Sequence, residues 1–242
     1  MWPLFQKEVS GFFSSITGYV VIIVFLVING LLVWVFPWNL NIIDGGYSSL
    51  APMFQLSPWI LLFLIPAITM KTFSQEKKDG TLDLLFTRPV SKLQIIGAKY
   101  FSALFLVFIA LMLTLPYYIT VILLGDPVGN IDHGATWGSY IGLFLLASAF
   151  TSIGIFSSTL SDNIVVAFII GIFLCAWMYA AFSFVGNLFP MGKMGNILVN
   201  MGMDSHYLSL SRGVIDSRDL IYYFGVIALF IALSNTKLSI KR

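Results

Sequence analysis

Six long apolar runs constrain this chain more than any other feature of its sequence. They cover residues 18–36, 51–70, 100–124, 137–160, 164–188 and 220–234. A helix needs roughly 20 mostly apolar residues to cross the hydrocarbon core of a bilayer, which is about the length of these runs. Irregular backbone finds no hydrogen-bond partners in that core, so spanning segments of this kind form helices. The sequence therefore predicts an all-α membrane protein, with six transmembrane helices in a single domain over residues 1–242.

The overall composition excludes a soluble domain. Hydrophobic residues make up 58% of the chain and charged residues only 10%, and the mean hydropathy is +0.92. Such a chain has too little polar surface to cover a water-soluble fold. Its single cysteine, Cys175, cannot form a disulfide within the chain. The basic residues form no nucleic-acid footprint, so we expect no nucleic-acid partner.

Three segments outside the runs also carry structural signals. Residues 1–15 place apolar side chains at helical spacing, which predicts a short helix lying in the membrane interface. Only residues 161–163 separate the fourth and fifth runs, so these two should form a tight hairpin. The segment 186–217 is half apolar and longer than an ordinary connection. We expect it to re-enter the outer half of the membrane and to cap the bundle.

The distribution of basic residues predicts the orientation. Six crossings put both termini, the stretch 71–99 and the turn 161–163 on the same side of the membrane. That side holds ten of the thirteen Lys and Arg residues. Loops rich in Lys and Arg stay in the cytoplasm. Both termini of this multi-pass protein are therefore expected to be cytoplasmic.

The polar stretch 71–99 predicts a short amphipathic helix between two turns. Gly80 should end the helix that continues from the second run, and Thr81 can cap a new helix with Asp83 in its first turn. Helical spacing gives that helix an apolar stripe of Leu82, Leu85 and Phe86. Pro89 then stops it, and Ser91 with Gln94 forms a capping box for the next helix. On periodicity alone, this is an ordinary loop helix whose stripe dips into the lipid interface.

A family resemblance adds a second interpretation. The run EKKDGTLDLLFTRPVSKLQIIGAK, residues 76–99, resembles the signature of ABC-2 type permeases, the six-span membrane subunits of one branch of ABC transporters. Two further stretches are similar to the family's first span and to its lead into the sixth span, namely FQKEVSGFFSSITGYVVIIVFLVING at 5–30 and HYLSLSRGVIDSRDLIYY at 206–223. Within the family, the overall likeness is greatest to permease subunits associated with gliding motility.

The resemblance implies a coupling helix that sits in a groove of a separate ATPase subunit at the cytoplasmic face. Residues 81–87 would form the contact, and Arg88 would lie on its polar rim. The acidic position at the end of the second span would link the helix ends to the ATPase. The positions that match the family's coupling element are Glu76, Gly80, Thr81, Leu82, Asp83, Leu85, Phe86 and Arg88. The resemblance also implies a second permease subunit, as a homodimer or heterodimer, and an accessory membrane protein with an extracytoplasmic domain is a further candidate partner.

The chain lacks the motifs of an enzyme. It has no G-x-x-x-x-G-K-[ST] phosphate loop, so ATP and Mg²⁺ are expected on the ATPase partner, with no cofactor bound by this chain. It has neither an H-E-x-x-H motif nor a G-x-S-x-G elbow. His133 and His206 stand alone in outer segments, where a surface or capping role is more common than metal binding. We therefore expect no catalytic residue and no metal site.

Polar residues inside the apolar runs have two interpretations. Asn29 is costly in lipid, so it should face a neighbouring helix or a pathway. Four hydroxyl residues share one face of the fourth run: Ser148, Thr151, Ser152 and Thr159. Small polar residues commonly pack membrane helices together, but the same face could line a substrate path.

Two functional hypotheses follow. In the first, the chain is the membrane part of an ATP-driven transporter, in which kinks at Pro66 and Pro116 let the spans rearrange. In the second, it passes ATP-driven motion to partner membrane proteins and no solute crosses. A continuous polar cavity along Asn29 and the hydroxyl face would favour transport, and a dry, closed bundle would favour the mechanical role.

Overall fold

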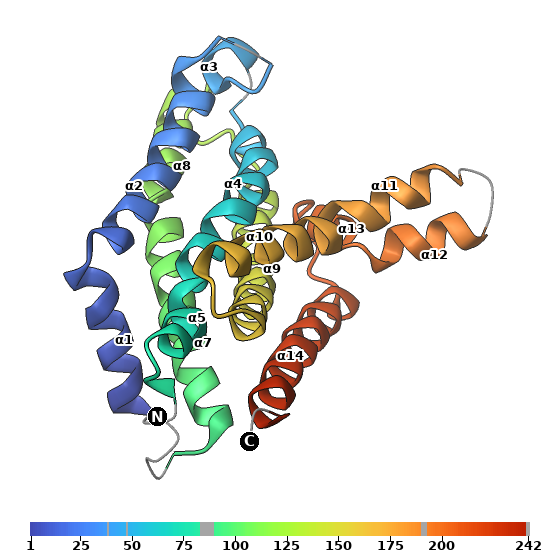
Figure 1. Cartoon of the computed structure of the whole chain (residues 1–242). Coiled ribbons are helices and arrows are strands. Elements are labelled where there is room, and N and C mark those ends of the chain that lie inside the picture. The colour runs from blue at the N-terminus through green and yellow to red at the C-terminus, as the bar shows by residue number, and fades with distance from the viewer. Residues whose placement is uncertain (38, 47, 83–89, 190–192, 241–242) are drawn as a thin grey trace.

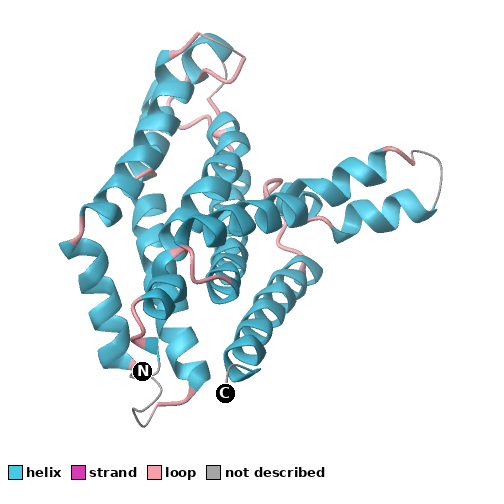
Figure 2. Cartoon of the chain, viewed as in Figure 1, coloured by secondary structure: helices cyan, strands magenta, loops and turns pink. Residues whose placement is uncertain are grey.

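The structure is a computed structural model of the chain, and it describes residues 1–37, 39–46, 48–82, 90–189 and 193–240. Over these residues the elements are all helices, with no strand (Figure 2). Six helical segments are long and apolar enough to cross a membrane, as the sequence predicts. The all-α prediction and the number of spans are therefore confirmed for the described residues.

Each span follows one of the predicted runs, and most are longer than predicted. The second extends beyond the apolar run by the eight residues 71–78, most of them polar, and the third begins inside the charged stretch. The spans are Ile16–Val35 (α2, Ile16–Gly30, with η1, Leu31–Val35); Ala51–Lys78 (α4, Ala51–Thr69, with α5, Lys71–Lys78); Lys92–Leu124 (α7, Lys92–Met112, with α8, Leu115–Leu124); His133–Leu160 (α9, with the same bounds); Ile164–Asn187 (α10, Ile164–Ala176, η2, Trp177–Ala181, and α11, Phe182–Asn187); and Ser217–Ser239 (within α14, Ser217–Ile240).

Local signals explain several helix ends. Ser91 and Gln94 form the predicted capping box at the start of α7. The third span is interrupted after Met112 and resumes as α8, in which Pro116 occupies the first turn, where a missing N–H costs little. Pro66 does not end α4, which continues to Thr69. The fourth and fifth spans are joined by the predicted tight turn, where the Asn163 side chain accepts a hydrogen bond from the Val165 N–H.

Helix α9 is the centre of the bundle. Its apolar window is 83% buried, the highest value of the six spans, and it packs against α4, α10 and α14. Glycines allow close approach of its neighbours. A Cβ on Gly154 would lie 2.1 Å from Thr69 Oγ1 of α4, and one on Gly138 would lie 2.5 Å from the Leu210 carbonyl oxygen. Small residues of this kind let membrane helices pack backbone to backbone.

We expect the Gly138→Ala variant to be less stable than the wild type by about 1–3 kcal/mol, which is the usual cost of overpacking. The added methyl group would meet backbone atoms of Leu210 and Gly213, which a side-chain rotation cannot move away. Thermal unfolding in detergent measures the effect. Gly225→Ala is the matched control, because a Cβ there meets nothing within 4 Å. Equal melting temperatures for the two variants would contradict the close packing.

Among the described residues, four further helices lie outside the spans: α1 (Trp2–Ser14), α3 (Ile42–Gly45), α12 (Lys193–Met201) and α13 (Met203–Leu210). Helix α1 precedes the first span, as predicted, and packs against α7. The fifth span ends in a hairpin of α11 and α12 that projects away from the bundle, and α13 then returns to pack on α9 (Figure 1). Helices α12 and α13 lie within the segment 186–217, whose re-entry into the membrane stays a prediction.

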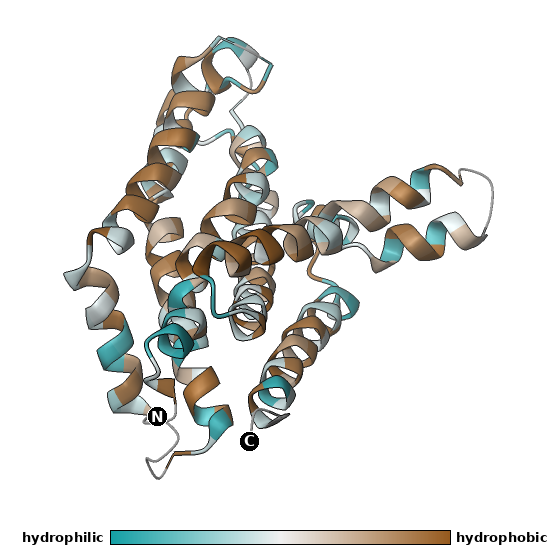
Figure 3. Cartoon of the chain, viewed as in Figure 1, coloured by the Kyte–Doolittle hydropathy of each residue, from teal (hydrophilic) through white to brown (hydrophobic). Residues whose placement is uncertain are grey.

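The two ends of the bundle differ in character. Both termini lie at the same end, which we call the basal end (Figure 1). The spans are coloured mainly as apolar, whereas α5 at the basal end is strongly hydrophilic (Figure 3). Many large apolar side chains on the spans are exposed, including Ile23, Phe63 and Ile221. Such a surface suits a lipid environment and leaves the polar basal end as the place where a soluble partner can dock.

Candidate functional site

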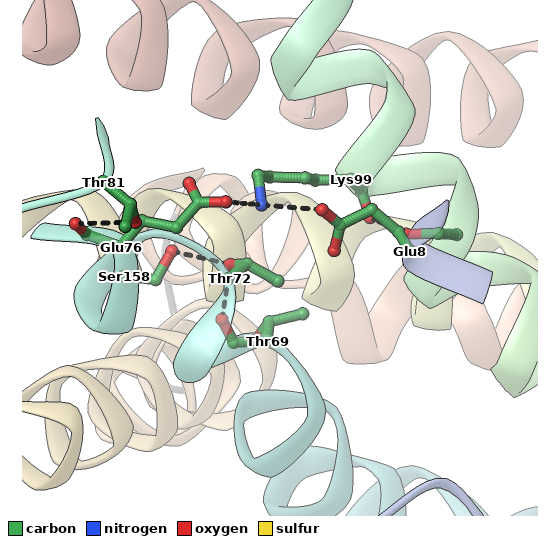
Figure 4. A network of polar contacts seen from close by, with 8 residues as sticks. Glu8, Thr69, Thr72, Glu76, Thr81, Lys99 and Ser158 are labelled. Carbon is green, nitrogen blue, oxygen red and sulfur yellow. Dashed lines mark hydrogen bonds and ion pairs between the residues drawn. The ribbon is translucent and has the colours of Figure 1, made fainter. Parts of the chain in front are cut away.

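Helix α5 is held at the basal end by the C-terminal turn of α9. The Thr72 hydroxyl lies 2.9 Å from the Ser158 hydroxyl (Figure 4). Ser74 Oγ donates to the Ser158 carbonyl oxygen at 3.2 Å. Lys77 Nζ donates to the Thr159 carbonyl oxygen. The last carbonyls of a helix have no partner within it, so α5 supplies the donors that the end of α9 requires. The polar extension of the second span is thus fixed to the centre of the bundle.

A buried ion triad joins three helices at the same end. Lys99 Nζ of α7 lies 2.7 Å from Glu76 Oε1 of α5 and 3.0 Å from Glu8 Oε1 of α1 (Figure 4). The Lys99 side chain is only 2% exposed, and those of Glu8 and Glu76 are 17% and 21% exposed. The ammonium group also lies 5.2 Å from the centroid of the Phe73 ring, a favourable position for a cation.

The triad links three helices because the buried charge of Lys99 is compensated by the two carboxylates, Glu8 and Glu76. A buried ammonium group is costly unless charged partners surround it, and here two carboxylates do so. The pairing ties the N-terminal helix, the extension of the second span and the start of the third span to one another. Glu76 Oε2 is also buried and has no hydrogen-bond partner among the described residues. A displacement of α5 would therefore be passed directly to α1 and α7.

Gly80 ends α5, as the sequence predicts. It adopts a φ of +68°, which an L-residue with a side chain rarely takes. The Thr81 N–H donates to the Glu76 carbonyl oxygen at 3.0 Å, and the Gly80 N–H donates to that of Lys77 at 3.2 Å. These two bonds form a Schellman motif. Thr81 Oγ1 also bonds back to Glu76, at 3.3 Å, so Thr81 is tied to the end of α5 (Figure 4).

Leu82 lies in the chain's own core. Its side chain is 8% exposed and belongs to a buried cluster with Phe73, Ile96 and Leu238. Little of Leu82 is therefore free to contact another protein, which the sequence pattern did not reveal. The other predicted residues of the coupling element, Asp83, Leu85, Phe86 and Arg88, lie outside the described residues.

The polar residues inside the spans are buried and hydrogen-bonded. Asn29 Nδ2 donates to the Phe25 carbonyl oxygen of its own helix at 2.9 Å, and Ser57 Oγ of α4 donates to Asn29 Oδ1 at 3.1 Å. Asn29 thus faces a neighbouring helix. The four hydroxyls of α9 each donate to a carbonyl of α9 itself, and their residues are at most 4% exposed: Ser148, Thr151, Ser152 and Thr159.

Sequence reasoning missed two members of the triad. Glu8 and Lys99 are separated by 91 residues, and neither belongs to a motif that indicates the other. The sequence offered one indication of this contact, which was the position of the two residues. Glu8 and Lys99 each lie at the end of an apolar segment, and the six-span topology brings these two ends to the same side of the membrane. Pairing charges across the bundle from that topology could have suggested the contact.

These features define a polytopic helical membrane protein with a rigid, polar basal end. Residues 45–240 match the sequence profile of the family described as "ABC-2 family transporter protein". The match covers most of the chain, so the protein belongs to the ABC-2 family of transporter membrane proteins. A comparison with curated proteins gave no match. Members of this family are membrane subunits and not themselves catalytic, and membership implies an ABC ATPase partner in a membrane context.

Proposed function

We propose that the basal end couples a separate ABC ATPase to the membrane bundle. The observation that carries the proposal is the buried triad, which ties α5 and the start of α7 into one unit on either side of the stretch 83–89. A force applied to that stretch would move both spans that flank it. Rigid-body motion of packed elements is a common form of such transitions. ATP and Mg²⁺ would be bound by the ATPase.

The proposal includes orientation and assembly. Both termini would lie in the cytoplasm of a bacterium and the bundle in its inner membrane, which the excess of basic residues at the basal side supports. Each functional unit would contain an ABC ATPase subunit and a second permease subunit, as a homodimer or a heterodimer. Likeness in sequence to permeases associated with gliding motility favours a place in such a complex, with an accessory membrane protein as a further partner.

Co-purification tests the coupling. The tagged chain is extracted from its native membrane in mild detergent, and the retained proteins are identified by mass spectrometry. We expect a subunit with a G-x-x-x-x-G-K-[ST] phosphate loop in stoichiometric amount. Chemical crosslinking of intact cells before extraction controls for loss of the partner in detergent. Recovery of the crosslinked chain without any nucleotide-binding subunit would overturn the proposal.

A mechanical role without solute transport is a second candidate, and a specific observation favours it. Asn29 and the hydroxyl face of α9, which could have lined a path, are buried between helices and satisfied by hydrogen bonds. Within one chain they therefore act as packing residues. The chain would then transmit ATP-driven motion to partner membrane proteins or serve as their scaffold.

Thiol labelling distinguishes these roles. We expect Ser152→Cys, in a Cys175→Ala background, to remain unlabelled by a water-soluble maleimide, because Ser152 is fully buried. Ser217→Cys is the control, since that position is exposed. The mechanical role predicts protection of Ser152→Cys during ATP turnover as well as at rest. Labelling that rises at least tenfold with ATP would show a water-filled path and would favour transport.

A further inference from the structure

A cleft of about 620 Å³ lies away from the basal end, where the start of α4 faces η2, α11 and α13. Its volume is within the range of sites that hold small organic ligands. The lining is mostly apolar and aromatic, with a few polar side chains among which Asp204 is acidic, and no residue that lines the cleft is basic. Among the described residues that line it, the cleft therefore has a mostly apolar wall with one acidic side chain.

Asp204 has no cationic partner among the described residues. The ion pairs that the structure shows involve Lys99 and His206, and none includes Asp204. Burial raises the pKa of Asp204, and the hydroxyls of Ser183 and Tyr179 beside it act in the opposite direction. Asp204 thus has two hydroxyl neighbours in the wall of the cleft, but no cation among the described residues balances its charge.

Aromatic rings line the same cleft as this acid. Trp59 and Tyr179 meet edge to face at 5.4 Å between centroids, and both line the cleft. Tyr207 is fixed in the wall, because its hydroxyl donates to the Phe54 carbonyl oxygen at 2.7 Å. Aromatic faces attract organic cations, and a carboxylate beside them adds a full opposite charge. An organic cation with an apolar body would interact favourably with both the carboxylate and the rings. A small inorganic cation would gain little binding free energy from the rings.

We propose that the cleft binds an organic ammonium ion with an apolar body, the ammonium group against Asp204 and the body against the aromatic wall. Two sources share this chemistry: a phospholipid with an ammonium head group, and a free amphiphilic amine. The site is separate from the basal end, and binding requires neither ATP nor the ATPase. Its test is therefore independent of the coupling proposed above.

Equilibrium dialysis of radiolabelled benzyltrimethylammonium against the full-length chain in a non-ionic detergent tests the site. We expect saturable binding to the wild type and at least a tenfold loss of affinity in Asp204→Asn, which keeps the shape and removes the charge. Asp204→Glu should restore much of the binding. Asp44→Asn, at an exposed acid of α3, is the matched control and should bind as the wild type does.

Two results would overturn the proposal: the absence of saturable binding to the wild type, or equal affinity in the wild type and Asp204→Asn. Melting temperatures of the variants show whether each remains folded, and retention by Asp204→Glu separates loss of charge from loss of structure. Nanodiscs identify the source. Competition by phosphatidylethanolamine, and not by phosphatidylglycerol, assigns the site to a lipid. If the probe binds equally well in both lipids and binding still depends on Asp204, the site is assigned to a free cation.

Discussion

The Lys99→Met variant is expected to be less stable than the wild type by about 3–5 kcal/mol, the usual cost of removing one partner from a buried charge pair. Methionine fills a volume similar to that of the lysine stem but leaves Glu8 and Glu76 facing each other without a cation. The two carboxylates would repel, and each would lose the partner that offsets its partial burial. Denaturant-dependent unfolding in mixed micelles measures the change in free energy.

A neutral triad is the decisive control for this prediction. The triple variant Lys99→Met, Glu8→Gln and Glu76→Gln removes the two unpaired charges as well as the lysine. Replacing a buried ion cluster as a whole is often close to neutral, so most of the lost stability should return. A Lys99→Met variant within about 1 kcal/mol of the wild type, or a triple variant as unstable as the single one, would show that the triad does not hold the basal end together.

The spans were predictable because a bilayer imposes a length and a composition on each helix separately. The end of α5 at Gly80 and the capping box of Ser91 with Gln94 were equally local, since each depends on residues within one turn. The triad was not predictable in this way, because Glu8, Glu76 and Lys99 meet only after three helices have packed. Local patterns specify where helices end, and tertiary packing decides which charges meet.

Leu82 shows the limit of a periodicity argument. A stripe at helical spacing indicates that one face of a helix is covered, but the pattern is the same whether the cover is lipid, a partner or the chain itself. The packing of Phe73 and Ile96 around Leu82 assigns this position to the chain itself. The polar residues of α9 illustrate the same limit, because the sequence left packing and pathway open until the burial of the helix was known.

The basal end can therefore be divided into a part that holds the structure and a part that we propose contacts the ATPase. The triad, the Schellman turn at Gly80 and the core position of Leu82 fix the two ends of the stretch 83–89. A partner that presses on this stretch would act on two helices, α5 and α7, that the Lys99–Glu76 ion pair joins. Rigid support of this kind is what a mechanical coupling element requires.

The last prediction separates these two parts by comparing Leu82 with Leu85. Leu82→Ala should lower the melting temperature, since truncating a buried leucine costs about 2–5 kcal/mol, while the ATPase still co-purifies below that temperature. Leu85→Asp should leave the melting temperature close to that of the wild type but weaken binding to the ATPase. An unpaired charge in an apolar contact should weaken ATPase binding at least tenfold, or by about 1.4 kcal/mol, with membrane insertion intact.

Both quantities are measured on the same preparations, by thermal unfolding and by titration of the detergent-solubilised chain with the ATPase. Gln75→Glu, at an exposed position of α5 outside residues 81–87, is the control that reports the effect of a new negative charge alone. Wild-type affinity in Leu85→Asp would remove the apolar stripe from the interface. Loss of binding in Leu82→Ala without any loss of stability would show that Leu82 contacts the ATPase directly, contrary to its place in the core.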